Sequence, residues 1–585
     1  MNQPIVTPPG NALKRYLPVI AIAVVAALVL ALLLWPKDKS SSSPDTTGAA
    51  TTVPSGSTTP ATDANGSVTV DTSAPFFFDE AKAAGIEGTI DWTDRCDTKV
   101  GRYAYPSPYA MPCIAPFKGD NGGATAKGVT GDAIKIVVYQ AQENDPIIQF
   151  IAGQVKNNDT NAQQADTIQK ISDMFGHFAE LYGRKLQLEF YTATGVANDE
   201  VAAKADATAI AEKQPFAVWG SPAFAGKPFA EELAAQKVLC LCTGGGDAKF
   251  VQERAPYLVT LVPSVMQGTI HLAEFVGKRL VGGKAQYSGD FVNVDRKIGL
   301  VYISTSAESQ KQAETLQSMV KDKYQGDIVD LVPYTIDPAT LQEQAATIIA
   351  RLKTEGITTV IFVGDPVAPI SLTKEATAQS YFPEWIVGGA GYTETTAFAR
   401  TYDQAQWKHA FGVCWYPAPV ALDKAGPYRR YTWYYGQDPA ARDSVNDLEN
   451  NAAFLYYFLQ AAGPNLTPQS FIDAMFNTAQ NPSDPLTAVR LSWGAKGRWP
   501  AELEPDYYGV DDQTEIWWDA TATGQDELGR DGTGMYRWVA GGKRYYPGER
   551  PNDAGAFFVQ AGSIDRYQDL PKGEELPDYP RPTGI

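Results

Sequence analysis

The sequence contains only three histidines, at His177, His271 and His409, and none has a partner at metal-ligand spacing. A histidine zinc site needs such side chains at short, fixed spacings, so this composition argues against one. His177 falls within an amphipathic helical pattern and is interpreted as a packing or surface residue. Basic residues are also scarce, with 49 Lys and Arg against 67 Asp and Glu and a net charge of −18. This balance argues against a nucleic-acid partner.

The chain also lacks the short motifs of common catalytic sites. It contains no G-x-S-x-G elbow, no G-x-x-x-x-G-K-[ST] loop and no H-E-x-x-H helix. Glycine runs at 244–246 and at 388–391 follow predicted strands, but neither has the full G-x-G-x-x-G spacing of a dinucleotide site. Because no set of catalytic residues is recognisable, the sequence predicts a binding protein that is not an enzyme and holds no cofactor or metal.

One long stretch without charge stands out near the start of the chain. Residues 17–35 carry no charged side chain, and Lys14 and Arg15 precede them. This length predicts a membrane span rather than the shorter apolar core of a signal peptide. We predict an uncleaved, single-pass anchor in the cell membrane, with residues 1–16 inside and the bulk of the chain outside. A cleaved signal peptide is the alternative. Basic residues flank the span at both ends, so the positive-inside rule hardly favours either orientation.

Three segments of unusual composition surround the central part of the chain. Residues 36–75 are Ser, Thr, Pro, Ala, Gly and Asp with few aromatics, which predicts a disordered linker spanning roughly 35 Å. Residues 76–130 form a cysteine-bearing extension. Residues 491–585 are rich in Trp, Tyr, Gly and Pro and are predicted to form strands and ordered loops. Their acidic pairs, Asp511–Asp512 and Asp526–Glu527, lack EF-hand spacing and are interpreted as solvated loops rather than a calcium site.

Five cysteines leave at least one unpaired within the chain. Cys96 and Cys113 enclose a loop rich in Tyr and Pro, and we predict a disulfide between them because the chain has the features of an exported protein. Cys240 and Cys242 lie two residues apart on one predicted strand and are poorly placed to bond each other. Cys242 with Cys414 is the predicted second pair, and three buried thiols are the alternative.

The central part of the chain alternates between predicted strands and helices. The segment AVWGSPAFAGKPFAEELAAQKVLCLCTGGG, residues 217–246, is typical of a strand, a helix and a strand, with exposed backbone at each strand end. The same series runs again from KIGLVYISTS at 297–306 to WIVGGAG at 385–391. This repetition predicts an α/β fold with two Rossmann-like lobes, each built on a parallel sheet. Ligands of such sheets bind beyond the carboxyl ends of the strands.

The order of these segments resembles a known family. GVTGDAIKIVVYQ, the segment at 217–246, YLVTLVPSVMQG, KIGLVYISTSAESQKQ, TVIFVGDP and FGVCWYP follow one another as in the type I periplasmic binding proteins. The branched-chain amino-acid and amide substrate-binding components of ABC importers are the most similar branch. The resemblance covers residues 131–480 and implies two lobes joined by a hinge, lobe 1 at 131–263 and 411–490 and lobe 2 at 264–410, which close on a ligand.

The resemblance also implies positions for the ligand. The segments 221–225 and 243–246 fall where the family holds a ligand carboxylate, and 304–306, Asp365 and 390–392 fall where it supplies an aromatic wall and an acidic partner for an amine. The sequence departs from the family at Phe224, where a hydroxyl residue is usual, and at Ala390, where an acid is usual. Either Asp365 replaces that acid or the ligand is not a zwitterion. The resulting candidate ligand-binding residues are Gln140, Gln142, Ser221, Phe224, Ala225, Thr243, Gly244, Gly245, Ser304, Thr305, Ser306, Asp365 and Tyr392.

These features together predict a membrane-anchored solute-binding protein that captures a small organic ligand for the permease of an ABC transporter. The ligand is expected to be amino-acid-like, an amide or an aromatic compound, and Phe224, Tyr392 and Gln140 or Gln142 suit a flatter or more apolar molecule. A ligand-sensing ectodomain of the same fold is one alternative, and it needs a separate signalling partner. An exported enzyme that uses a metal at the carboxylates of 491–585 is a less favoured one.

Overall fold

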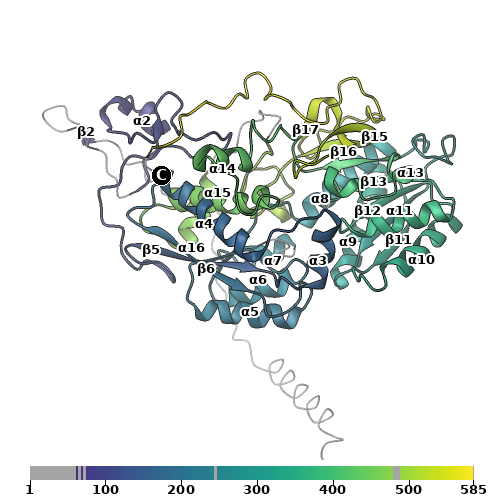
Figure 1. The fold of residues 1–585 in the computed structure, drawn as a ribbon, viewed down its shortest axis with the longest axis horizontal. Coiled ribbons are helices and arrows are strands. Elements are labelled where there is room, and N and C mark those ends of the chain that lie inside the picture. The colour runs from purple at the N-terminus through teal and green to yellow at the C-terminus, as the bar shows by residue number, and fades with distance from the viewer. Residues whose placement is uncertain are drawn as a thin grey trace, which may run out of the picture. The chain divides into compact units, whose positions relative to one another are not determined.

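The computed structural model describes residues 74–242, 247–389, 391–478 and 488–583, together with the backbone of 61–62 and 68–69 (Figure 1). The two short backbone pieces form the antiparallel pair β1 (Ala61–Thr62) and β2 (Val68–Thr69). The predicted membrane span and most of the predicted linker lie outside these ranges. Within them, no helix is long and apolar enough to cross a bilayer. Residues 58–585 belong to one unit, and the two predicted lobes are both found in it.

Lobe 1 is built on a parallel sheet with the strand order β6–β5–β7–β8–β9. Ile136, Val218 and Leu239 have no exposed surface, because helices pack on both faces of this sheet (Figure 1). The elements in chain order are β5 (Ala133–Gln140), α3 (Pro146–Gln154), α4 (Asn161–Phe178), β6 (Lys185–Thr192), α5 (Glu200–Glu212), β7 (Ala217–Trp219), α6 (Gly226–Ala235), β8 (Leu239–Leu241), α7 (Ala248–Gln252) and β9 (Leu258–Val259). The predicted α/β alternation is confirmed here.

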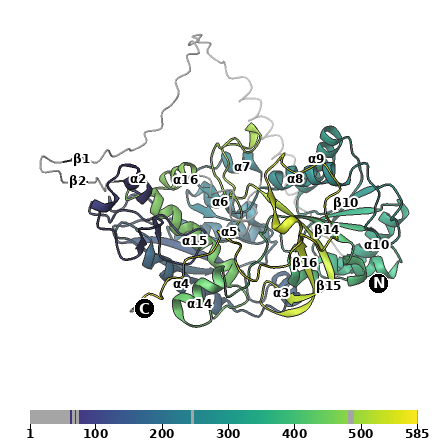
Figure 2. The same ribbon diagram turned by 90° about the horizontal axis from the view of Figure 1, so that it is seen from above.

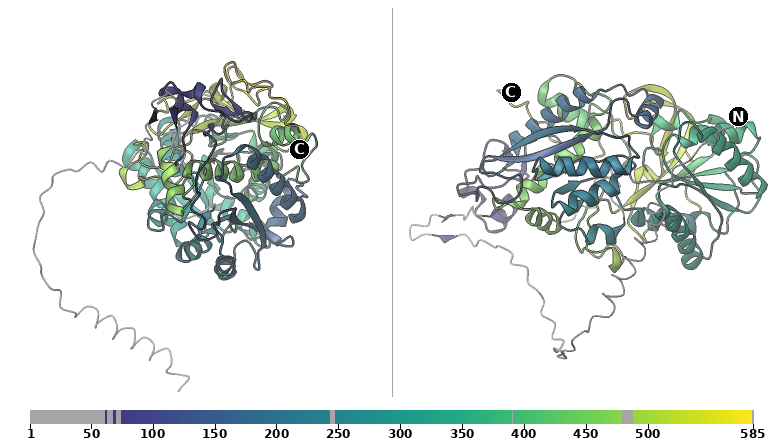
Figure 3. Two further views of the ribbon diagram at one scale, coloured as in Figure 1. Left: turned by 90° about the vertical axis from the view of Figure 1, so that its left-hand side faces the viewer. Right: turned by 90° about the horizontal axis from the view of Figure 1, so that it is seen from below.

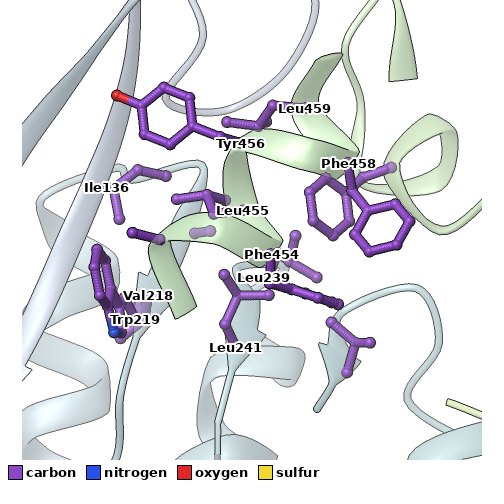
Figure 4. Packing of buried hydrophobic residues seen from close by; sticks show 14 of the residues in the cluster. Ile136, Val218, Trp219, Leu239, Leu241, Phe454, Leu455, Tyr456, Phe458 and Leu459 are labelled. Carbon is purple, nitrogen blue, oxygen red and sulfur yellow. The ribbon is translucent and has the colours of Figure 1, made fainter. Parts of the chain in front are cut away.

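Three helices from later in the chain return to this lobe: α14 (Pro427–Tyr435), α15 (Val445–Ala462) and α16 (Pro468–Asn477). The apolar side of α15 supplies Phe454, Leu455 and Phe458, which lie against the strands in Figure 4. Gly463 ends the helix with φ 81°, a value that favours glycine. Lobe 1 therefore has a core made from two distant parts of the sequence.

Lobe 2 is built on a second sheet, whose order is β11–β10–β12–β13–β14–β15–β16, with β17 paired to β15. Strands β10 to β14 are parallel, as predicted. The elements are α8 (Val265–Phe275), the π-helical turn η2 (Val276–Leu280), β10 (Ile298–Ile303), α9 (Ala307–Tyr324), β11 (Ile328–Tyr334), α10 (Leu341–Thr354), β12 (Thr359–Val363), α11 (Ala368–Ala378), β13 (Glu384–Gly388), α12 (Thr396–Ala399), α13 (Gln404–Trp407) and β14 (Ala410–Cys414).

Two parts of this sheet differ from the prediction. Strand β14 pairs with β13 in lobe 2, so the chain does not re-enter lobe 1 at residue 411. The C-terminal extension adds η3 (Ala501–Leu503), β15 (Gln513–Gln525), β16 (Asp531–Trp538), η4 (Val539–Gly542) and β17 (Arg544–Tyr545). Strand β15 runs antiparallel to β14, and both views in Figures 2 and 3 (right) show the yellow C-terminal strands beside the teal lobe. The second sheet is therefore mixed, because the extension covers an edge that β14 leaves unpaired.

The cysteine-bearing extension packs on lobe 1. It contains α2 (Phe78–Ala83), the 3₁₀ turn η1 (Glu87–Thr89) and the strand pair β3 (Cys96–Asp97) and β4 (Arg102–Tyr103). The predicted disulfide between Cys96 and Cys113 is confirmed, with Cα atoms 5.8 Å apart. Tyr103, Tyr105 and Met111 join the buried cluster of lobe 1. The extension thus enlarges the core instead of forming a separate domain.

The predicted second pair, Cys242 with Cys414, is wrong. Cys414 is a buried, unpaired thiol on β14 of the second sheet, whereas Cys242 follows β8 in the first sheet. The structure joins Cys242 to Cys240 instead. Their Cα atoms lie 5.2 Å apart, within the range of disulfides. The expectation that these two cysteines are poorly placed to bond each other is therefore wrong as well.

Candidate functional site

The first five strands of each sheet share one order, in which the second strand pairs with the first and the third lies on its other side. In such sheets the connections leave in opposite directions on either side of the first strand, and ligands bind beyond its carboxyl end. The switch point lies between β5 and β7 in lobe 1 and between β10 and β12 in lobe 2. The four loops that follow these strands carry the candidates Gln140, Gln142, 221–225, 304–306 and Asp365.

Two interactions show that these carboxyl edges face each other. Lys227, in the first turn of α6, forms an ion pair of 2.9 Å with Glu308, in the first turn of α9. These helices follow β7 and β10, the strands at the two switch points. In addition, the Tyr392 hydroxyl beyond β13 donates to the Asp447 carboxylate in the first turn of α15, at 3.4 Å. Loops at the carboxyl edges of both lobes therefore contact each other, and the space between them is the candidate site.

In lobe 1, a carboxylate that the sequence analysis did not single out holds the loops together. Asp145 is buried and accepts hydrogen bonds from the backbone of Ile147, Ile148 and Ala197. The Ala197 carbonyl in turn accepts from the backbone nitrogens of Phe224 and Ala225, both at 3.1 Å. Asp145 thus fixes the loop after β5 against the turn that carries Phe224.

The lobe 1 candidates differ in what they offer a ligand. Gln140 is buried, and its amide donates to the Asn161 carbonyl at 2.9 Å, so its side chain positions α4. Ala225 has no exposed surface. Gln142, Ser221 and Phe224 are half-buried. Thr243, Gly244 and Gly245, together with Ala390 of lobe 2, lie outside the described residues.

In lobe 2, the turn after β10 is exposed and held by one hydroxyl group. The Ser309 Oγ accepts from the backbone nitrogens of Thr305 and Ser306, at 3.2 and 3.3 Å. Ser304 is half-buried, and its nitrogen donates to the Tyr334 carbonyl at 2.7 Å. The Thr305 and Ser306 side chains are therefore exposed at the carboxyl end of β10, and the Ser306 hydroxyl donates to the Glu308 carboxylate at 3.0 Å.

Asp365 lies at the predicted edge, but its carboxylate is fully engaged within lobe 2. One oxygen accepts from the Tyr334 hydroxyl at 2.6 Å, and the other accepts from the backbone nitrogens of Val367 and Ala368 at the start of α11. The side chain is buried. These contacts explain the presence of an acid at this position without a ligand, since a carboxylate at a helix start accepts hydrogen bonds from backbone N–H groups that lack partners in the helix.

Tyr392 is the most exposed aromatic candidate, with 45% of its surface accessible. Its φ is 59°, in the left-handed region that non-glycine residues seldom adopt. The Asp447 carboxylate and, after it, burial raise the pKa of the Tyr392 phenol. Trp415 and Tyr416, which follow β14, stack on each other with ring centroids 4.1 Å apart. A Cβ atom placed on Gly391 would lie 3.9 Å from Trp415 Nε1, so these rings border the same loop.

A second carboxyl group near this loop was missed by the sequence analysis. Glu394 is buried and accepts from the Gly391 nitrogen at 3.1 Å and from the Thr393 hydroxyl at 3.0 Å. Burial raises its pKa to about 7. The group lies four residues beyond Ala390, but it is buried and its oxygens already accept hydrogen bonds within the loop.

The C-terminal extension also reaches the carboxyl edge of lobe 2. Thr514 of β15 lies opposite Cys414, and Arg544 of β17 lies opposite Thr514. The Arg544 guanidinium donates to the Trp415 carbonyl at 2.8 Å and to the Asp512 carboxylate at 2.7 Å. Asp512 has no exposed surface, so this acidic pair is part of a buried ion pair and not of a solvated loop as predicted.

No group of three metal-ligating side chains occurs in the described ranges. Asp526 pairs with Arg400, and Glu527 accepts from the backbone of Thr396 and Ala397. His271 is buried, and burial lowers its pKa to about 3, so it is neutral. Two surface hollows, of about 350 and 340 Å³, lie along α9 and beside Pro106 and Asp569, away from the carboxyl edges.

No family model matches this chain, and no curated protein matches it. Many solved structures similar in fold are type I periplasmic or solute-binding proteins of ABC transporters. One, from Rhodopseudomonas palustris in complex with 3,4-dihydroxybenzoic acid, is 15% identical, covers 69% of this chain and 97% of its own, and has a TM-score of 0.46. The branched-chain amino-acid binding protein LivJ from Streptococcus pneumoniae, in complex with isoleucine, is 12% identical over 69% of this chain and 99% of its own, with a TM-score of 0.46. The ligands of those proteins are not assigned to this chain.

Proposed function

We propose that this chain is an extracytoplasmic solute-binding protein that holds a small organic molecule between its lobes and passes it unchanged to the permease of an ABC importer. In this proposal residues 17–35 anchor the chain in the membrane and the following linker carries the lobes. The ligand is amino-acid-like, an amide or an aromatic compound.

One observation carries the proposal: two sheets of the same strand order turn their switch points toward each other. The ion pair between Lys227 and Glu308 joins the first helical turns that follow β7 and β10. A site shared between two lobes can enclose a ligand on all sides, and hinge closure then couples binding to a change of shape. The half-buried Phe224, the exposed Tyr392 and the Trp415–Tyr416 pair supply aromatic surface for the ligand.

The direct test is thermal unfolding of the full-length protein against a panel of amino acids, amides, aromatic acids, amines, nucleosides and sugars. A compound at one hundred times its dissociation constant raises the free energy of unfolding by about 2.7 kcal/mol, which gives a clear shift in Tm. We expect at least one class of the panel to produce such a shift.

A pair of variants locates the binding site. Thr305→Trp places a large ring at the carboxyl end of β10 and is expected to abolish the shift. Thr315→Trp makes the same substitution in the hollow along α9, on the same lobe, and is expected to leave the shift intact. The proposal fails if no compound shifts the wild type, or if the shift survives Thr305→Trp and is lost in Thr315→Trp.

A further inference from the structure

Asp447 is a carboxylate without a cationic partner at the interlobe site. It lies in the first turn of α15, the helix that returns to lobe 1, and its side chain is exposed. Its one side-chain hydrogen bond within the described residues is the long contact of 3.4 Å from the Tyr392 hydroxyl of lobe 2. No ion pair of the described chain includes it, although its neighbour Asp443 binds Arg530 at 2.7 Å.

Aromatic side chains lie near Asp447. Burial raises the pKa of Asp447, and the hydrogen bond from Tyr392 acts in the opposite direction. Burial also raises the pKa of Tyr416, and the charges of Tyr392 and Asp447 raise it further. Trp415 stacks on Tyr416 and borders the Gly391 loop. Asp447 thus accepts from one aromatic side chain, Tyr392, and the stacked pair Trp415 and Tyr416 borders the same loop.

The other carboxylates near this loop already have partners. Asp365 is bound by Tyr334 and by the start of α11. Glu527 accepts from the backbone nitrogens of Thr396 and Ala397, at 2.8 and 3.0 Å. Glu394 accepts from Gly391 and Thr393 and is buried. Among these acids, Asp447 alone remains exposed and without a strong partner.

We infer that Asp447 and the rings of Tyr392, Trp415 and Tyr416 form a subsite for the cationic group of the ligand, a primary or a quaternary ammonium. A carboxylate supplies the opposite charge, and aromatic faces attract a cation through their quadrupoles. The acid that Ala390 does not provide thus comes from α15 in the opposite lobe. This inference rests on the proposed function, since it names the chemistry of one end of the interlobe site.

The test is isothermal titration of the full-length protein with four probes of one shape: benzylammonium, benzyltrimethylammonium, benzyl alcohol and benzoate. We expect at least one of the two cations to bind at least about tenfold more tightly than the alcohol, and benzoate to bind more weakly than both cations. Asp447→Asn is expected to weaken the cations about tenfold or more and to leave benzyl alcohol within about twofold.

Two further variants control this result. Asp473→Asn removes one negative charge from the exposed face of α16 and is expected to change no affinity. Tyr392→Leu removes one ring and is expected to weaken the cations several-fold while leaving the charge of Asp447 in place. This second variant keeps the test open if Asp447→Asn does not fold.

Three results overturn the inference. Benzyl alcohol or benzoate binds as tightly as both cations; or the affinity for the cations is the same in wild type, Asp447→Asn and Tyr392→Leu; or no probe binds although another compound of the thermal panel does. The proposed function is decided separately, by the thermal panel and the Thr305→Trp variant, and it stands if that shift is present in the wild type and lost in the variant. Failure of the whole panel, by contrast, removes the proposed function itself.

Discussion

Glu394 is a buried carboxyl group whose titration links pH to stability. Burial raises its pKa to about 7 in the folded chain, above the value of 4.5 for an exposed glutamate. The folded state therefore holds more protons than the unfolded state between these values, and the free energy of unfolding falls as pH rises from about 4.5 to about 7. Glu394→Gln removes this loss, which amounts to roughly 3 kcal/mol across the window.

Urea denaturation of wild type and Glu394→Gln at a series of pH values measures the difference. Asp506, whose pKa burial raises to about 8, contributes a loss of the same sign, so the wild-type slope contains both groups. Asp506→Asn separates the two contributions, because it should remove the part of the loss in the free energy of unfolding that extends up to about pH 8. Parallel curves for wild type and Glu394→Gln would contradict the assignment.

Asp365 is expected to act on stability more than on the ligand. Asp365→Ala leaves the Tyr334 hydroxyl and two backbone nitrogens at the start of α11 without their acceptor. We expect a loss of about 2 kcal/mol in the free energy of unfolding, since both a helix start and a buried polar group are affected. Tyr334→Phe, which keeps the contacts at the helix start, should cost less. Chemical denaturation measures both, and an unchanged stability in Asp365→Ala would refute this role.

Only part of the site could be predicted from individual residues. The sequence places Asp365 and Thr305 at strand ends, and parallel strands carry such ends to one edge. Whether a side chain faces a ligand or a neighbour depends on partners such as Tyr334, which is 31 residues away in the chain. Asp447 gave no signal at all, because an acid in the first turn of a helix is the ordinary choice there.

The turn between β15 and β16 connects the two lobes through Arg530. Its guanidinium donates to the carbonyls of Val155 and Lys156 at the end of α3 and forms an ion pair of 2.7 Å with Asp443. Phe150, Ile151 and Val155 of this region also pack against the buried cluster of lobe 2. The C-terminal extension therefore holds part of lobe 1 against lobe 2.

Arg530→Ala is expected to favour separation of the lobes. We expect a larger radius of gyration for the ligand-free protein in small-angle scattering, and an affinity about tenfold weaker for the compound found in the panel, since the open form binds less well. Arg566→Ala is the matched control, because Arg566 donates to Gln525 and Asp526 within the same hairpin. An identical scattering curve for wild type and Arg530→Ala would contradict this role.

The elements were predictable where their pattern is local. The alternation of buried strands and amphipathic helices predicted both parallel sheets, because each βα unit carries its own periodicity. The C-terminal strands were not placed, since Trp517 pairs with Phe411 across more than a hundred residues and antiparallel addition to a sheet edge leaves no local pattern. The predicted pair of Cys242 with Cys414 was wrong because residues from 411 onward were assigned to lobe 1, whereas β14 pairs with β13 in the second sheet.

At the scale of the whole molecule, the proposed function requires that the two lobes share one site. Its two parallel sheets have equal strand order, and the ion pair between Lys227 and Glu308 joins their carboxyl edges. A ligand at this site must touch loops from both lobes at once, whereas a ligand in either surface hollow touches one local region. The number of lobes that a bound ligand protects therefore distinguishes binding between the lobes from binding in a surface hollow.

Hydrogen exchange of the full-length protein, with and without the compound found in the thermal panel, tests this claim most directly. Exchange reports local opening of the backbone, and bound ligand slows it where the loops are held. We predict slower exchange in the loops at 140–145 and 220–225 of lobe 1 and, together with them, at 304–306 and 391–394 of lobe 2. Slower exchange confined to one lobe, or to α9 and the region around Asp569, would contradict the account.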